Sequence, residues 1–172
     1  MRRNNPHILV WNEVLQDLRF ILKMTSLDLV ITYSALLLFN IFIDGYGNNE
    51  DGSFFESIGV TTVFLLLTFA FPFIETLLLQ LIPILLLKKT GLHKWIIIII
   101  DALLFSSLHI PQYDLYVEIV YSFPGGIILA WSFIKYYKVS WFRAFYVTMT
   151  IHALSNFINC ALILFDESTS YL

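Results

Sequence analysis

The chain consists of long apolar runs separated by short polar segments. Five runs of at least 16 residues can be marked out, at residues 27–43, 58–87, 95–110, 115–134 and 141–165. A helix that crosses a bilayer needs about 20 mostly apolar residues. The run at 58–87 exceeds this length, and we expect it to bend or break near Pro72. The pattern predicts an all-α fold, namely a polytopic transmembrane helix bundle with about five to six membrane helices.

The N-terminal segment has a different pattern. Residues 7–23 mix apolar and charged side chains at helical spacing, which predicts an N-terminal amphipathic helix lying on the membrane surface. No signal-peptide core is visible before residue 24, so the first run is expected to be an uncleaved anchor. We divide the chain into an N-terminal amphipathic and basic segment (1–26), a first membrane helix with an acidic loop (27–57), a helical core (58–165) and a tail (166–172).

The positive charges are distributed unevenly along the chain. All ten Lys and Arg residues lie in three segments, Arg2–Lys23, Lys88–Lys94 and Lys135–Arg143, and the alternate loops carry acidic residues instead. Cytoplasmic loops of membrane proteins collect Lys and Arg. We therefore expect a multi-pass protein of a cell membrane, with its N-terminus in the cytoplasm and its C-terminus outside.

The composition supports the membrane assignment. Hydrophobic residues make up 58% of the chain and charged residues 13%, whereas about a quarter of a soluble domain is charged. We expect the lipid bilayer as a partner and no nucleic acid. Cys160 is the single cysteine, so no disulfide can form within the chain.

Three ionisable side chains interrupt the apolar runs at one depth. Glu75, His109 and His152 lie 13, 15 and 14 residues from a lysine at the basic end of their runs. At the rise of an α-helix this places each about 20 Å from the basic interface. Asn156 follows His152 by one turn and shares its face. Such groups are rare inside membranes and usually functional.

The chemistry of this layer leaves several possibilities open. A carboxylate and imidazoles can activate water, and Glu75, His109 and His152 could instead bind a divalent metal such as Zn²⁺. A single histidine could equally form a structural hydrogen bond, but that does not explain three groups at one level. Asp101 lies near the depth of Gln80, where we expect a structural hydrogen bond or ion pair. Ser106 and Ser107, beside His109, are expected to bond within their helix rather than act as nucleophiles.

Two short motifs resemble those of a known family. Phe105-Ser-Ser-Leu-His109 is similar to the FxxxH motif of the CPBP family, which comprises the CAAX proteases and bacteriocin-processing (Abi) proteins. His152-Ala-Leu-Ser-Asn156 is similar to the HxxxN motif of the same family. The motifs occur in the family's order, and the resemblance covers residues 58–164.

A third motif matches in part. Glu75-Thr76-Leu-Leu-Leu-Gln80 stands where the family has EExxxR, so Thr76 replaces the second glutamate and Gln80 replaces the arginine. The resemblance implies an intramembrane metalloprotease fold in which the first glutamate remains. The two replacements favour an alternative, a catalytically weakened membrane immunity or binding protein of the same fold.

The resemblance also implies how the residues would act. Glu75, helped by His109, would activate water, and His152 and Asn156 would stabilise the oxyanion of a peptide under hydrolysis. Phe105, Thr76 and Gln80 occupy positions within these motifs and would support the site. The expected partner is a peptide or membrane-protein substrate, such as a bacteriocin precursor, in a bacterial cell membrane; self-immunity is a related role. An ion or proton pathway would need polar positions graded across the membrane.

Overall fold

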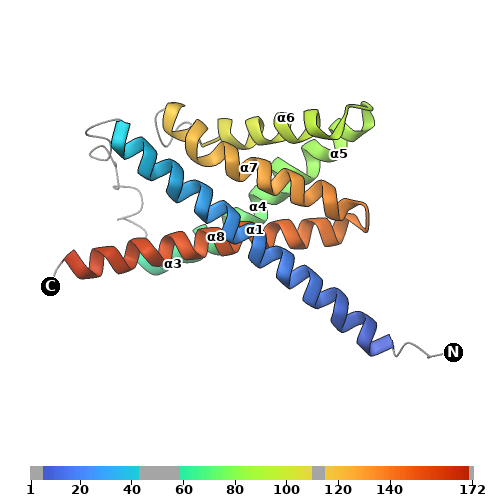
Figure 1. Ribbon diagram of the computed structural model, residues 1–172, viewed down its shortest axis with the longest axis horizontal. Coiled ribbons are helices and arrows are strands. Elements are labelled where there is room, and N and C mark those ends of the chain that lie inside the picture. The colour runs from blue at the N-terminus through green and yellow to red at the C-terminus, as the bar shows by residue number, and fades with distance from the viewer. Residues whose placement is uncertain (1–5, 43–58, 110–114, 171–172) are drawn as a thin grey trace.

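The computed structural model describes residues 6–42, 59–109 and 115–170, and within them the side chains of 11–35, 37, 59–109 and 122–162. All regular elements in these ranges are helical, which confirms the predicted all-α class. The described chain forms five helices (Figure 1). They are α1 (Pro6–Phe42), a composite helix over Val60–Lys89, α6 (Lys94–Ser107), α7 (Leu115–Tyr137) and α8 (Trp141–Ser170). The predicted acidic loop, at 44–57, lies outside the described residues.

Helix α1 joins two segments that the sequence pattern separated. It is a single helix of 37 residues that contains both the amphipathic segment and the first apolar run. No glycine occurs in it, and its one proline is the first residue, so nothing in the sequence interrupts the backbone hydrogen bonds. The helix therefore continues without a break across the segment boundary that we placed after residue 26. Helix α8 likewise continues to Ser170, through most of the segment expected to be a tail.

The composite helix continues past two prolines and includes two π-helical segments. It consists of α3 (Val60–Leu65), the π-helical η1 (Leu66–Ala70), α4 (Phe71–Glu75), the π-helical η2 (Thr76–Leu81) and α5 (Ile82–Lys89). Each π segment ends two residues before a proline, Pro72 or Pro83. A proline lacks the N–H group that an α-helix uses and crowds the preceding turn. Widening by one residue accommodates this. The helix therefore does not break at Pro72, although a break was one of the two outcomes that we expected there.

The helices pack around a core that is closed between α6 and α7. Gly126 of α7 lies so near α6 that a Cβ atom there would be 3.0 Å from the Cα atom of Ala102. Phe133, Ile98 and Ile151 are fully buried in the same core. Helix α1 packs obliquely across α7 and α8 (Figure 1). This packing holds the composite helix, α6 and α8 in fixed positions relative to one another.

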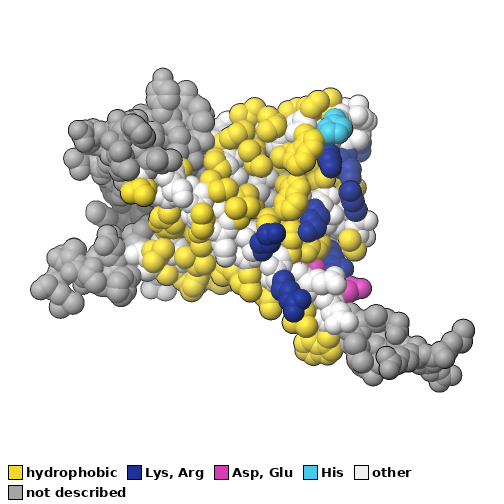
Figure 2. Space-filling view, in the orientation of Figure 1, with side chains coloured by type: hydrophobic (Ala, Val, Ile, Leu, Met, Phe, Trp, Pro, Cys, Tyr) yellow, Lys and Arg dark blue, Asp and Glu magenta, His cyan; other side chains and the backbone are white. Residues whose placement is uncertain are grey.

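The basic residues gather at one end of the molecule. The α5–α6 and α7–α8 connections lie at the same end, where most of the Lys and Arg side chains are visible, while the middle of the surface is largely apolar (Figure 2). Lys88 lies 3.6 Å from the centre of the Tyr137 ring, and Lys135 lies 3.8 Å from that of Phe20. By length and composition, one helix of the described part, Val60–Lys89, could cross a membrane.

Candidate active site

Glu75 meets two histidines from two other helices. It is the last residue of α4, placed between the two π segments. Its Oε2 atom lies 3.4 Å from Nε2 of His152, which is on α8, and 3.9 Å from Nε2 of His109, which follows α6. The three groups that the sequence places at one depth therefore lie together. We call them the Glu75 cluster.

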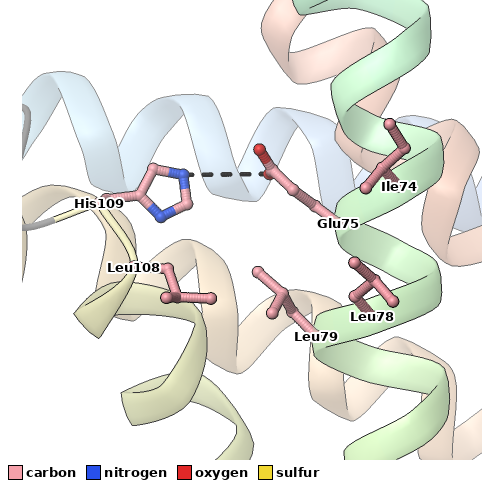
Figure 3. A pocket seen from close by; sticks show the side chains of 6 residues that line it. All are labelled: Ile74, Glu75, Leu78, Leu79, Leu108 and His109. Atoms are coloured by element: carbon pink, nitrogen blue, oxygen red, sulfur yellow. Dashed lines mark ion pairs between the residues drawn. The ribbon is translucent and has the colours of Figure 1, made fainter.

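The ring of His109 is held by the end of its own helix. Its backbone N–H donates to the Ser106 carbonyl at 3.0 Å, and its Nδ1 atom lies 2.8 Å from the Phe105 carbonyl. A carbonyl only accepts hydrogen bonds, so Nδ1 carries the proton and donates it. This leaves Nε2 directed toward Glu75, as Figure 3 shows. The 3.9 Å separation exceeds a direct hydrogen bond and is a distance that a water molecule can bridge.

Phe105, four residues before His109, packs against both histidine rings of the cluster. Its ring centre lies 4.7 Å from that of His109 and 5.5 Å from that of His152, in tilted and edge-on arrangements. The side chain is buried, with 5% of its surface exposed. Phe105 thus contacts both imidazoles and limits how either can turn. A supporting role in the site, which the FxxxH resemblance implies, stays a prediction.

Asn156 contacts the backbone of the helix that carries Glu75. Its Nδ2 atom donates to the Leu67 carbonyl at 2.9 Å. In an α-helix that carbonyl would accept from Phe71, but here the Phe71 N–H bonds to Leu66. The π-helical partner would be Pro72, which has no N–H. Asn156 therefore supplies the hydrogen bond that the proline removes, and its donor is engaged away from the Glu75 cluster.

The two residues that depart from the EExxxR motif are buried. Thr76 and Gln80 both have 0% of their surface exposed. Their side-chain polar atoms have no hydrogen-bond partner among the described residues, and the same holds for both carboxylate oxygens of Asp101. The structural hydrogen bond or ion pair expected for Asp101 is thus not found within that part of the chain.

A small pocket lies beside the Glu75 cluster. Its volume is about 170 Å³, and Glu75 and His109 form its polar side (Figure 3). The apolar side is made by four residues, Ile74, Leu78, Leu79 and Leu108. A quarter of the Glu75 side chain is exposed, whereas His152 behind it is 8% exposed. A ligand in this pocket would meet an apolar wall and the carboxylate together.

The two serines beside His109 have structural contacts. The Ser107 hydroxyl donates to the Leu104 carbonyl at 2.8 Å, within the helix as expected. The Ser106 hydroxyl instead lies 2.7 Å from that of Ser122, which ties α6 to α7. Neither contact places a hydroxyl beside an imidazole in the manner of a serine nucleophile.

Sequence reasoning overlooked one acidic residue near the site. Asp28 of α1 is half-buried, and its Oδ1 atom would lie 3.2 Å from a Cβ atom built on Gly125 of α7. The signal was present, because Asp28 is an acidic residue at the start of the apolar run 27–43. Helix α1 therefore brings a further ionisable group into the bundle, in addition to Asp101 and the Glu75 cluster.

The described residues contain no group of three or more His, Cys, Asp or Glu arranged to hold a metal ion. The residues of the Glu75 cluster are those that could, from the sequence, bind a divalent metal such as Zn²⁺. We therefore derive no chemical step through a metal, and metal dependence stays a prediction.

The fold and the cluster define a class, a helical protein with a carboxylate and two imidazoles between apolar helices. Residues 57–158 match the family model described as "Type II CAAX prenyl endopeptidase Rce1-like". The match spans more than half of the chain, and the protein belongs to this family, as its motifs indicated. Proteins of this family are membrane proteins. Comparisons with curated proteins and with solved structures give no match.

Proposed function

We propose that the protein is an intramembrane endopeptidase that hydrolyses a peptide bond with water activated by Glu75. The observation that carries this proposal is the Glu75 cluster, in which one carboxylate oxygen lies 3.4 and 3.9 Å from two imidazole nitrogens beside an apolar pocket. We place five to six helices in a cell membrane, with the N-terminus and the basic end in the cytoplasm. The apolar middle of the surface supports this placement (Figure 2).

The first chemical step uses the gap between Glu75 and His109. A water molecule there donates one hydrogen bond to the carboxylate and one to Nε2 of His109. Glu75 takes a proton from this water, and the resulting hydroxide attacks the carbonyl carbon of the peptide. A positioned general base of this kind contributes about 10²–10⁴-fold to a rate.

The second step requires a donor and a proton. Nε2–H of His152 donates to the oxyanion that forms when hydroxide adds to the carbonyl. The protonated Glu75 then gives its proton to the leaving nitrogen as the C–N bond breaks, which restores the carboxylate. Asn156 would join His152 as a second oxyanion donor only by releasing the Leu67 carbonyl, so we assign it first to holding η1 in place.

The pocket favours an apolar peptide substrate. Leucine and isoleucine side chains line it, and the family's name refers to prenylated CAAX substrates. The Glu75 cluster lies about 20 Å from the basic end at the helical rise, hence nearer the opposite face. We therefore favour a secreted or membrane-inserted peptide, such as a bacteriocin or signalling precursor, over a cytosolic prenylated protein. Reporter fusions at the 44–57 loop and the C-terminus test this orientation; cytosolic readouts from both would reverse it.

A second function remains open because of Thr76 and Gln80. Both are uncharged and fully buried, so the second glutamate and the arginine of the EExxxR motif have no charged counterpart here. A membrane immunity or binding protein of the same fold needs no catalytic cluster. It predicts that Glu75→Ala and His109→Ala variants that fold keep their protective effect.

Cleavage of a panel of apolar peptides by the purified protein tests the proposal. Wild type should cleave at least one peptide, while Glu75→Gln and His152→Ala should not do so at comparable rates. Parallel reactions with a chelator test the metal, because chelator-resistant cleavage shows that no divalent ion is needed. Equal cleavage by wild type and both variants would trace the activity to a contaminant or another site and overturn the proposal.

A further inference from the structure

Five polar side chains are fully buried in the bundle and have polar atoms without a partner among the described residues. Each has 0% of its surface exposed, and each has a polar atom without a hydrogen-bond partner in the described part of the chain. They are Thr76, Gln80, Asp101, Ser132 and Thr148. They come from η2, α6, α7 and α8, so four segments of the fold contribute to the set.

These side chains lie between the Glu75 cluster and the basic end. The contact between Glu75 and His109 fixes the register of the antiparallel composite helix and α6. In that register Gln80, eight residues before Lys88, and Asp101, seven residues after Lys94, lie at nearly the same depth.

The other members extend the set in both directions. Thr76 precedes Gln80 by four residues and lies one turn nearer the cluster. Thr148 precedes His152 by four residues and lies below it on the same face of α8. Ser132 of α7 is three residues from Lys135 and therefore nearest the basic end. We call the five side chains the polar column.

A dry interior does not account for the polar column. Buried polar groups in folded proteins are almost always hydrogen-bonded, to protein atoms or to ordered water. Buried waters typically make about three hydrogen bonds to such groups. The column offers hydroxyl, amide and carboxyl groups at successive depths, and Nδ1 of His152 at its upper end also lacks a partner among the described residues. We propose that ordered water molecules bind along the polar column, from His152 toward Asp101.

This inference goes beyond the proposed function and does not depend on it. If the protein hydrolyses peptides, each cleavage consumes one water molecule, and the column holds a supply next to His152. If the protein binds a partner without catalysis, the same waters stabilise the buried helices. A test by protein stability therefore addresses the column whether or not cleavage is found.

Threonine-to-valine substitutions distinguish a hydrated column from a dry one. Valine keeps the shape and removes the hydroxyl. If Thr148 and Thr76 bind water, Thr148→Val and Thr76→Val should each lower the melting temperature in detergent by about 2–4 °C. If the hydroxyls are dry and unpaired, removing them should leave the melting temperature unchanged or raise it.

Thr68 provides the matched control. It is buried like the other two, with 1% exposed, but its hydroxyl donates to the Phe64 carbonyl of its own helix at 2.7 Å. Such bonds slightly disfavour helices, so Thr68→Val should not lower the melting temperature. A fall for all three variants would assign the effect to valine itself and overturn the inference.

A double substitution tests whether the same waters join the column. Gln80→Met keeps a similar volume and removes the amide. Side chains that share water molecules should be coupled, so Gln80→Met combined with Thr148→Val should lower the melting temperature by less than the two separate shifts together. A rise for Gln80→Met alone, or strict additivity of the two shifts, contradicts a shared chain of water.

Discussion

The bundle contains two ionic groupings that are built differently. At the basic end, Arg143 of α8 binds Asp17 of α1 through two hydrogen bonds of 2.8 Å, and Glu13 through a third of 3.1 Å. We call this grouping the Arg143 clamp. In the Glu75 cluster, the two contacts between carboxylate and imidazole are 3.4 and 3.9 Å. One grouping is closely paired, and the other leaves gaps.

The difference in distances indicates different roles: the Arg143 clamp holds two helices together, and the Glu75 cluster is the candidate active site. Two-point pairing of a guanidinium with a carboxylate is among the stronger polar contacts, and it fixes α1 against α8. The distances in the Glu75 cluster exceed the usual length of a direct N–H···O bond, which is about 2.7–3.2 Å. Groups that must accept a water molecule and a peptide need such room. We therefore expect substitutions in the clamp to change stability and substitutions in the cluster to change activity.

Glu75→Gln should produce the largest effect. The amide keeps the shape but cannot take a proton, so cleavage should fall by about 10²–10⁴-fold. Because Glu75 forms no short hydrogen bond in the described structure, the melting temperature should stay close to that of wild type. Peptide cleavage rates and melting curves of the same preparations check the loss of activity and the unchanged stability. If Glu75→Gln lost activity only because it unfolds, the cluster would act on stability like the Arg143 clamp, and the expected difference between them would be wrong.

His152→Ala should come next. Loss of an oxyanion donor typically lowers a rate by about 10²–10³-fold. Phe105 would lose its edge-on contact with the His152 ring, so a small loss of stability should accompany the effect. His152→Gln, which retains an N–H donor, should recover part of the rate. Equal rates for the Ala and Gln variants would count against the donor role.

Arg143→Ala should destabilise the protein without impairing the chemistry. It leaves Asp17, whose side chain is 16% exposed, without its guanidinium partner, which should lower the free energy of unfolding by about 1.5–3 kcal/mol. Arg143→Lys keeps the charge but not the two-point geometry, so it should retain only part of the stabilisation that Arg143 gives. Denaturation in detergent measures the loss, and cleavage per folded molecule should stay near wild type. A large fall in that rate would place the clamp in the catalytic machinery.

Asn156→Leu should have the smallest effect. It removes the hydrogen bond to the Leu67 carbonyl, which should lower the free energy of unfolding by about 1 kcal/mol. Because we assign Asn156 to the backbone of η1, cleavage should fall by less than in His152→Ala. A rate loss as large as that of His152→Ala would show that Asn156 leaves Leu67 and serves the oxyanion.

The sequence predicted the part of the site that depends on helical depth. Counting residues from the lysines was enough to bring Glu75, His109 and His152 to one level, because each lies on or directly after a helix with a short loop at its basic end. The position of Phe105 followed from its spacing to His109 in the same way. Depth along a helix and the face that a residue occupies can thus be predicted from residue spacing.

The features that were missed depend on local exceptions or on contacts between helices. The π segments lie next to Pro72 and Pro83, which remove backbone donors inside a helix that continues past both. The bond from Asn156 to Leu67 exists only because of the first of these. Asp28 lies on α1 and its carboxylate lies beside Gly125 of α7, and no count along one helix reveals that contact.

The central claim is that water activated by Glu75 breaks the peptide bond. The most direct measurement is cleavage of an apolar peptide by the purified protein in ¹⁸O-labelled water, with the new C-terminus analysed by mass spectrometry. Wild type should release a product with ¹⁸O in its new carboxyl group, and Glu75→Gln should release almost none in the same time. Labelled product at equal rates from both proteins, or a bound peptide that folded wild-type protein leaves intact, would contradict this claim.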